Sequence, residues 1–163
     1  MEELLLFPTV EQVLRQYAEF FHNDYEQRLI AHDRYASGGL IESIRTRVVV
    51  GSESVDVVCN LRDYWKWVEN DTRPHWPPPD VLRRWVEIKP TIPKPADSLE
   101  RERFIKSLAY LVGRKISREG TKGTHDMEEA KKLSLDTFRA EISRALGRDV
   151  INYIKKMTPG AAG

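Results

Sequence analysis

The chain has 163 residues, of which 40% are hydrophobic and 31% are charged, and its formal net charge is +1. This length predicts a single domain over residues 1–163, with its core in 9–157 and a frayed tail over 158–163. The near-zero charge gives no global signal for nucleic acid. Cys59, the only cysteine, excludes an intrachain disulfide. The first residues do not resemble an export signal, and no stretch has the ~18 apolar residues of a membrane span, so we expect an unexported protein without membrane contact.

The first half predicts a long helix followed by a hairpin. Thr9 and Gln12 form a capping-box start, and apolar residues then recur at helical spacing to about Asp33. Ser37–Gly39 should end this helix and lead into a short helical turn. Arg45–Val50 and Val55–Leu61 alternate as paired strands, with Val55, Val57, Cys59 and Leu61 on one face. Asp63 is placed to cap a short helix over residues 64–68.

The second half predicts helices separated by stiff connectors. Residues 70–79 are irregular and end in three prolines. Asp80 should cap a helix in which Val81, Leu82, Trp85 and Val86 form one buried stripe. Ser98 opens a helix that closes near Gly120, and a last helix begins between Asp126 and Ser134. The fold class is therefore α+β: a small antiparallel sheet, the hairpin 45–61, flanked by a long N-terminal helix and by C-terminal helices.

Charge is divided unevenly along the chain. Residues 1–33 hold seven acidic and two basic residues, and residues 99–122 hold seven basic and three acidic ones. These could be ordinary solvated helix faces. They could also be complementary surfaces between subunits, in which Glu11 and Glu19 of one copy face a basic group of the next. That basic group consists of Arg114, Lys115 and Arg118. A third possibility is that this basic helix follows DNA non-specifically; the matching acidic helix favours contact with a neighbour.

One catalytic pattern is present. Pro79-Asp80 followed by Glu87-Ile88-Lys89 matches the Mg²⁺-dependent nuclease signature of the PD-(D/E)xK type, in which the acids bind metal and the lysine steadies a water molecule. That chemistry needs Asp80 and Glu87 on adjacent strands, whereas the surrounding apolar residues have helical spacing. A nuclease using Asp80, Glu87 and Lys89 is therefore kept only as the alternative function.

Other chemistry has weaker support in the sequence. Residues 120–124 contain Gly-Thr-Lys-Gly-Thr but lack the order of a phosphate-binding loop. The four histidines lack zinc-site spacing, and Cys59 lies in an alternating apolar run rather than in an electropositive setting. We therefore predict no catalytic site, no cofactor and no metal, and expect that the protein is not an enzyme.

The stretch from Ser37 to Thr72 resembles the tail-completion, or head–tail joining, family of tailed bacteriophages. Members have a helix, a Gly-Leu-x-x-Ser-Ile step, a valine-rich hairpin and a Tyr-Ala-x-x-x-Glu-x-Gly-Thr segment. The matching residues are Gly39, Leu40, Ser43, Ile44, Val48–Val50, Val55–Val58, Tyr64, Val68, Glu69 and Thr72. Trp65 stands where a small residue is usual, and Asp71 replaces the glycine before Thr72. The resemblance covers about a quarter of the chain.

The resemblance implies a structural virion subunit, several copies of which close into a ring at the neck or tail top. Expected partners are other copies of the chain, the neighbouring neck, portal or tail proteins, and genomic DNA in the lumen. The expected location is the virion, after assembly in the cytoplasm of the host bacterium. Aromatic residues around a stiff loop often anchor interfaces, although core packing explains tryptophans equally well. The anchors predicted here are Trp65, Trp67, Trp76, Pro77 and Pro78.

Overall fold

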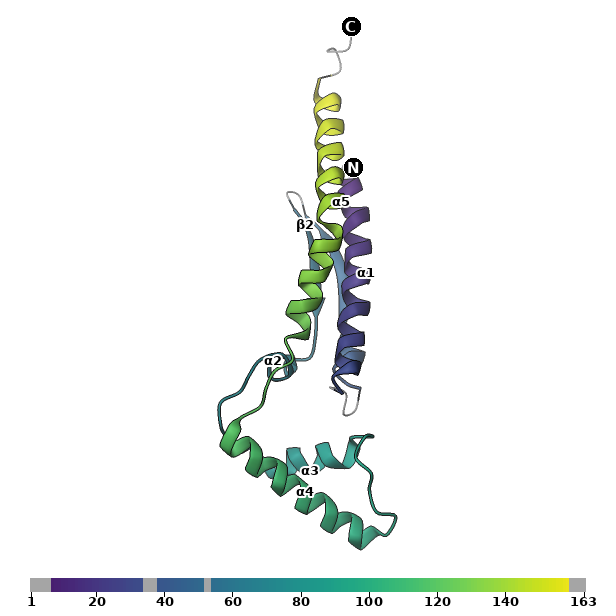
Figure 1. Ribbon diagram of the computed structural model, residues 1–163. Coiled ribbons are helices and arrows are strands. Elements are labelled where there is room, and N and C mark those ends of the chain that lie inside the picture. Colours follow the sequence, from purple (N-terminus) through teal and green to yellow (C-terminus); the bar gives the residue numbers. More distant parts are fainter. Residues whose placement is uncertain (1–6, 34–37, 52–53, 159–163) are drawn as a thin grey trace. The chain divides into compact units, whose positions relative to one another are not determined.

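The computed structural model describes residues 7–33, 38–51 and 54–158 (Figure 1). In these ranges the chain forms five α-helices, one 3-10 turn and one two-stranded antiparallel sheet, which confirms the predicted α+β class. The elements are α1 (Pro8–Ala31), η1 (Ile41–Ser43), β1 (Arg45–Val50), β2 (Val55–Asn60), α2 (Trp65–Glu69), α3 (Pro79–Ile88), α4 (Ser98–Glu119) and α5 (Asp126–Met157).

The chain divides into two compact units. Unit 1 contains residues 1–27, Ile44–Leu61 and Met127–Gly163, and unit 2 contains Arg28–Ser43 and Arg62–Asp126. Two such units can still belong to one folding domain, so the single domain stays a prediction. The described part of the predicted tail is Thr158; the rest of it, together with Ser37 and the tip of the hairpin, lies outside the described residues.

Unit 1 is organised by α1, α5 and the hairpin (Figure 1). Phe138 of α5 contacts two aromatic rings of α1 edge-on, with centroid distances of 6.1 Å to Tyr17 and 5.7 Å to Phe20. Edge-to-face contacts of this kind stabilise by about 0.5–1.5 kcal/mol beyond the area they bury. The helical spacing of the apolar residues therefore does form the packed face that it predicts.

The hairpin has the predicted strands and an uninterrupted register. Arg45 pairs with Asn60 at one end and Val50 with Val55 at the other. Val55, Val57 and Cys59 are half-buried, whereas Asp56 and Asn60 are exposed, as the alternation predicts. Since an isolated two-stranded hairpin is marginally stable in water, it depends on the helices of its unit.

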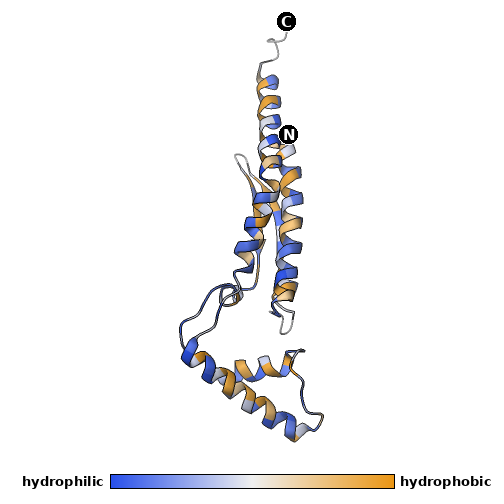
Figure 2. Cartoon of the chain, in the orientation of Figure 1, coloured by the Kyte–Doolittle hydropathy of each residue, from blue (hydrophilic) through white to orange (hydrophobic). Residues whose placement is uncertain are grey.

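Unit 2 has its core between α3 and α4. Leu82, Val86 and Ala109 are buried, and the partly buried residues packed on them are Trp85, Ile92, Ile105, Leu108, Val112 and Ile116. Asp97 caps α4: its carboxylate accepts from the Leu99 and Glu100 amides at 2.9 Å each. The apolar residues of α4 are interleaved with polar ones along the helix (Figure 2), as an amphipathic helix requires.

Two segments of unit 2 that are far apart in sequence lie side by side. The Thr72 and Thr121 backbones form an isolated bridge, and their hydroxyls lie 2.8 Å apart. The Thr124 amide donates to the Val68 carbonyl at 3.1 Å. A Cβ on Gly123 would lie 2.1 Å from the Glu69 carbonyl oxygen, so glycine is required by this approach of two backbones.

Four local predictions are wrong. Val81 is 61% exposed, so the buried side of α3 is made of Leu82, Val86 and the half-buried Trp85. Thr9 and Asp80 lie inside the first turns of α1 and α3, because Pro8 and Pro79 are already helical and proline suits the first helical position. Asp63 does not cap α2, because the N-cap residue is Tyr64 and no side chain forms a capping hydrogen bond there.

Candidate assembly surfaces

The basic residues predicted on α4 share its solvent-facing side. Arg114, Lys115 and Arg118 are all exposed. Their spacing of three and four residues places them on the side of α4 opposite the buried Ala109 and Gly113. This exposed arrangement is here called the basic face of α4.

The two acidic residues predicted on α1 differ in their surroundings. Glu11 forms an i,i+4 ion pair with Arg15, and its side chain is 14% exposed. Glu19 is exposed, in the next turns of the same helix. An i,i+4 ion pair of this kind stabilises a helix by only about 0.3–0.5 kcal/mol. Because Glu11 is largely covered and already paired, the exposed Glu19 is the better placed of the two to meet a basic partner.

The predicted aromatic anchors also separate into two groups. Trp67 is 66% exposed and Trp76 is 49% exposed, whereas Trp65 is half-buried. The Trp76 ring lies 5.9 Å from the Tyr110 ring on α4, and Tyr110 is itself 58% exposed. Pro77 is buried and Pro78 is exposed. Trp67 and the Trp76–Tyr110 pair therefore have the exposure that an interface anchor needs.

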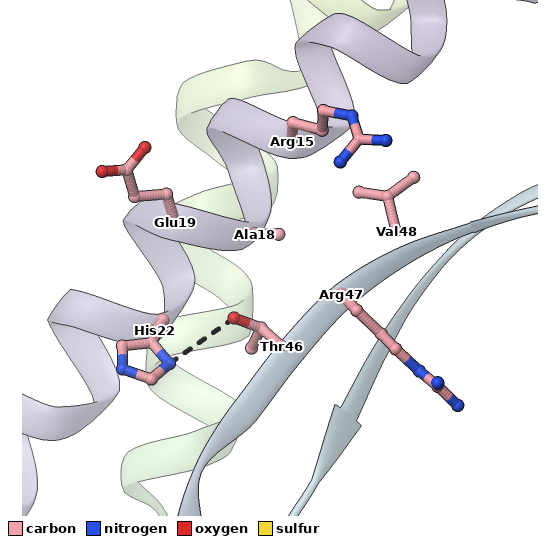
Figure 3. Close-up of a pocket in the computed structure, with 7 residues that line it drawn as sticks. All are labelled: Arg15, Ala18, Glu19, His22, Thr46, Arg47 and Val48. Carbon is pink, nitrogen blue, oxygen red and sulfur yellow. Dashed lines mark hydrogen bonds between the residues drawn. The ribbon is translucent and has the colours of Figure 1, made fainter.

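A shallow groove of about 270 Å³ runs between α1 and β1 in unit 1 (Figure 3). His22 Nδ1 lies 3.4 Å from the Thr46 hydroxyl and closes one end. Figure 3 shows the Glu19 carboxylate pointing away from β1 and the Arg47 guanidinium pointing away from α1. These two charges project in different directions and do not converge on the groove.

Two of the three residues of the nuclease alternative lie on a helix, and the third follows it directly. Asp80 and Glu87 are exposed on α3, seven residues or about 10 Å apart along its axis. Lys89 is buried: its Nζ donates to the Asp33 carbonyl at 2.7 Å and lies 2.9 Å from the Asp33 carboxylate and 5.2 Å from the centre of the Trp85 ring. Lys89 thus joins the end of α3 to Asp33. Within the described residues no three His, Cys, Asp or Glu side chains gather in a way that could hold a metal ion.

Cys59 lies on the half-buried side of β2. Burial raises the pKa of its thiol above the usual value. The reactive thiolate is therefore scarce at neutral pH, which fits a packing role for this side chain.

The burial of two carboxylates, those of Asp149 and Asp126, is not predicted by the sequence. Asp149 of α5 is 2% exposed and accepts from the first free amides of α1, at 2.9 Å from Thr9 and 2.8 Å from Val10. Asp126 is fully buried and lies 2.7 Å from His32 Nδ1. The signal for Asp149 was a lone acid in the middle of an apolar helix side, after Ile142 and Ala145. Nothing in the sequence pointed to its partner 140 residues away.

The end of α5 exposes a group of large apolar side chains. Because Asp149 caps the start of α1, the last eight residues of α5 extend past that start. Each of the apolar residues among them is at least 41% exposed, namely Val150, Ile151, Tyr153, Ile154 and Met157. With Leu146 at 46% exposed, the spacing 146, 150, 153 and 157 is that of a helix-pairing seam. We call Leu146, Val150, Tyr153, Ile154 and Met157 the apolar stripe of α5.

Comparison with protein families, with characterised proteins and with solved structures finds no match. None of the helices in the described part of the chain is long and apolar enough to cross a membrane. Function is therefore inferred from the residues and their arrangement.

Proposed function

We propose that the chain is a structural virion protein, a ring-forming subunit of the neck or tail-completion region that joins head to tail in a tailed bacteriophage. The observation that supports assembly best is the apolar stripe of α5, five large side chains between 41% and 66% exposed. Contiguous exposed apolar surface on a soluble protein marks an interaction site. The resemblance of residues 37–72 supplies the kind of assembly.

The basic face of α4 and the acidic part of α1 support head-to-tail contact. A ring needs two different surfaces on each subunit, so that every copy meets the next in the same way. The exposed Arg114, Arg118 and Glu19 provide opposite charges on separate helices. Opposite charges across an interface speed association and select the partner.

Native mass spectrometry tests the proposal. The purified chain should form a closed multimer of fixed copy number at micromolar concentration. Val150→Glu with Ile154→Glu should shift it to monomers, because two charges would be buried in the contact. Arg144→Glu, on the polar side of α5, is the matched control and should assemble. A wild-type chain that stays monomeric across the concentration range contradicts the proposal.

A second experiment separates the two surfaces of the proposed contact. Arg114→Glu with Arg118→Glu should weaken assembly, and Glu19→Lys in the same chain should partly restore it if α4 meets α1 of a neighbour. Without restoration, and with salt-sensitive binding of DNA to the wild-type ring, the basic face would instead line the lumen.

DNA incubated with the protein and Mg²⁺ or Mn²⁺ should stay intact. Cleavage that is lost in both Asp80→Ala and Glu87→Ala would favour the nuclease.

A further inference from the structure

A second groove, of about 670 Å³, lies beside α4 in unit 2. Its apolar lining, here called the floor, consists of half-buried Trp85, Val112 and Ile116 together with Leu111, which is 57% exposed. The rest of its lining, here called the rim, consists of Lys115, Glu119, Gly120, Thr121 and Lys122. The volume falls within the roughly 300–1,000 Å³ of sites that enclose ligands or side chains. We call this site the α4 groove.

The α4 groove is suited to an apolar segment that has acidic residues beside it. Two lysines and one glutamate leave the rim net positive, while the floor offers apolar surface. Apolar anchors in such grooves supply affinity, and charges at the rim fix the direction and register of the bound chain.

The same sequence contains one segment with this chemistry. Residues 1–7 read Met-Glu-Glu-Leu-Leu-Leu-Phe, and no other stretch places two acidic residues directly before four apolar ones. Phe7 directly precedes α1, where its carbonyl accepts from the Glu11 amide at 2.9 Å. The six residues before Phe7 can span about 20 Å when extended. We call residues 1–7 the arm.

We infer that the arm of one copy docks in the α4 groove of the next copy. The leucines of the arm match the apolar floor in chemistry, and Glu2 and Glu3 match the positive charges of Lys115 and Lys122. Since the arm and the groove are different surfaces, the contact is head-to-tail and can close a ring. The inference rests on the proposed assembly and identifies one of its contacts. It also gives Lys115, a member of the basic face, a protein partner.

Cysteine cross-linking between copies tests the inference. In a Cys59→Ser background, chains with Leu5→Cys are mixed with chains with Leu111→Cys and treated with a short bismaleimide. Covalent dimers should form at least tenfold faster than with Leu99→Cys, which lies on α4 at 66% exposure but does not line the groove. Dimers no faster than this control would overturn the inference. So would a Leu5→Cys/Leu111→Cys chain that cross-links within itself at high dilution, because the arm would then occupy its own groove.

Peptide binding separates this inference from the proposed function. A fluorescent peptide of residues 1–7 should bind the full chain carrying Leu5→Glu, whose own arm is disabled. Leu111→Glu or Lys115→Glu in that chain should weaken binding at least tenfold, whereas Leu99→Glu should not. If Leu5→Glu rings form as well as wild-type rings, arm docking fails and the proposed function stands. If the wild type forms open chains of copies instead of closed rings and the peptide binds the groove, docking stands and the proposed function fails.

Discussion

Each of the two units of the molecule is stabilised internally by a different kind of contact. In unit 1, side chains of distant helices meet, as Phe138 does with Tyr17 and as the Asp149 carboxylate does with the start of α1. In unit 2, α3 packs on α4, but residues 68–72 are also joined to 121–125 through backbone groups. Packing of side chains can be adjusted by neighbouring rotamers, whereas two backbones in contact leave no room for an added atom. Unit 2 should therefore be the more sensitive to small changes at its glycines.

Gly123→Ala should have the largest effect on stability. Its Cβ would lie 2.1 Å from the Glu69 carbonyl oxygen, so the two segments must separate. We expect a loss of about 3 kcal/mol in the free energy of unfolding, measured by urea denaturation. Gly147→Ala in α5 of unit 1 is the control, because nothing lies within 4 Å of its Cβ. It should be neutral or stabilise by up to about 1 kcal/mol. Equal effects at the two glycines would contradict the contrast between the units.

Lys89→Ala should come next. It removes the ammonium group that contacts the Asp33 carbonyl and carboxylate, although the Asp33 side chain stays 45% exposed and can be rehydrated. We expect a loss of about 2 kcal/mol, below the 3–5 kcal/mol of a fully buried pair. Thermal unfolding measures it, with the exposed Lys106→Ala on α4 as control. A Lys89→Ala chain as stable as wild type would remove the structural role assigned to this lysine.

Asp149→Ala tests the matching contact in unit 1. The carboxylate accepts from two amides at the positive end of α1, so its loss leaves both without an acceptor. We expect a loss of about 1–2 kcal/mol by thermal denaturation, and a smaller loss for Asp149→Asn, which keeps one acceptor oxygen. Asp136→Ala, at an exposed site on the same helix, should change stability by less than about 0.5 kcal/mol. Similar losses at the two positions would rule out capping by Asp149.

The smallest effect concerns Cys59 of the hairpin. Because burial raises the pKa of its thiol, the thiolate is scarcer in the folded chain than in the unfolded one at neutral pH. Reaction with a disulfide reagent at pH 7 should be slow, should accelerate as pH rises, and should become fast in denaturant. Rapid labelling of the folded chain at pH 7 would show that the strand face holding Cys59 is open.

Periodic features could be predicted from the sequence. The helical spacing along α1 and α4 and the alternation along β2 depend on neighbouring residues, and the structure has these elements with ends shifted by one or two residues. The cap predicted at Asp80 is wrong because Pro79 already has helical geometry, so α3 begins before Asp80. Val81 was placed in the core because its spacing fits, but one face of α4 covers only part of the helix.

Contacts between distant residues could not be predicted in the same way. Residues 120–124 lack the order of a phosphate-binding loop, and in the structure Gly120 has a φ of 73°, a conformation that glycine adopts readily. What the pattern does not contain is the partner: Gly123 is needed because Glu69 approaches it, and these residues are 54 positions apart. The charge of Arg118 predicts its exposure, whereas the sequence is equally compatible with core packing for Trp67, which the structure exposes. Whether either residue contacts a neighbour depends on an assembly that a single chain does not contain.

The most direct measurement of the central claim is electron microscopy of the purified, assembled chain. The account predicts closed rings of one copy number with a central opening, and a map in which the apolar stripe of α5 and the α4 groove are both covered by neighbouring copies. Separate monomers, or a map in which both surfaces face solvent in every copy, would contradict it.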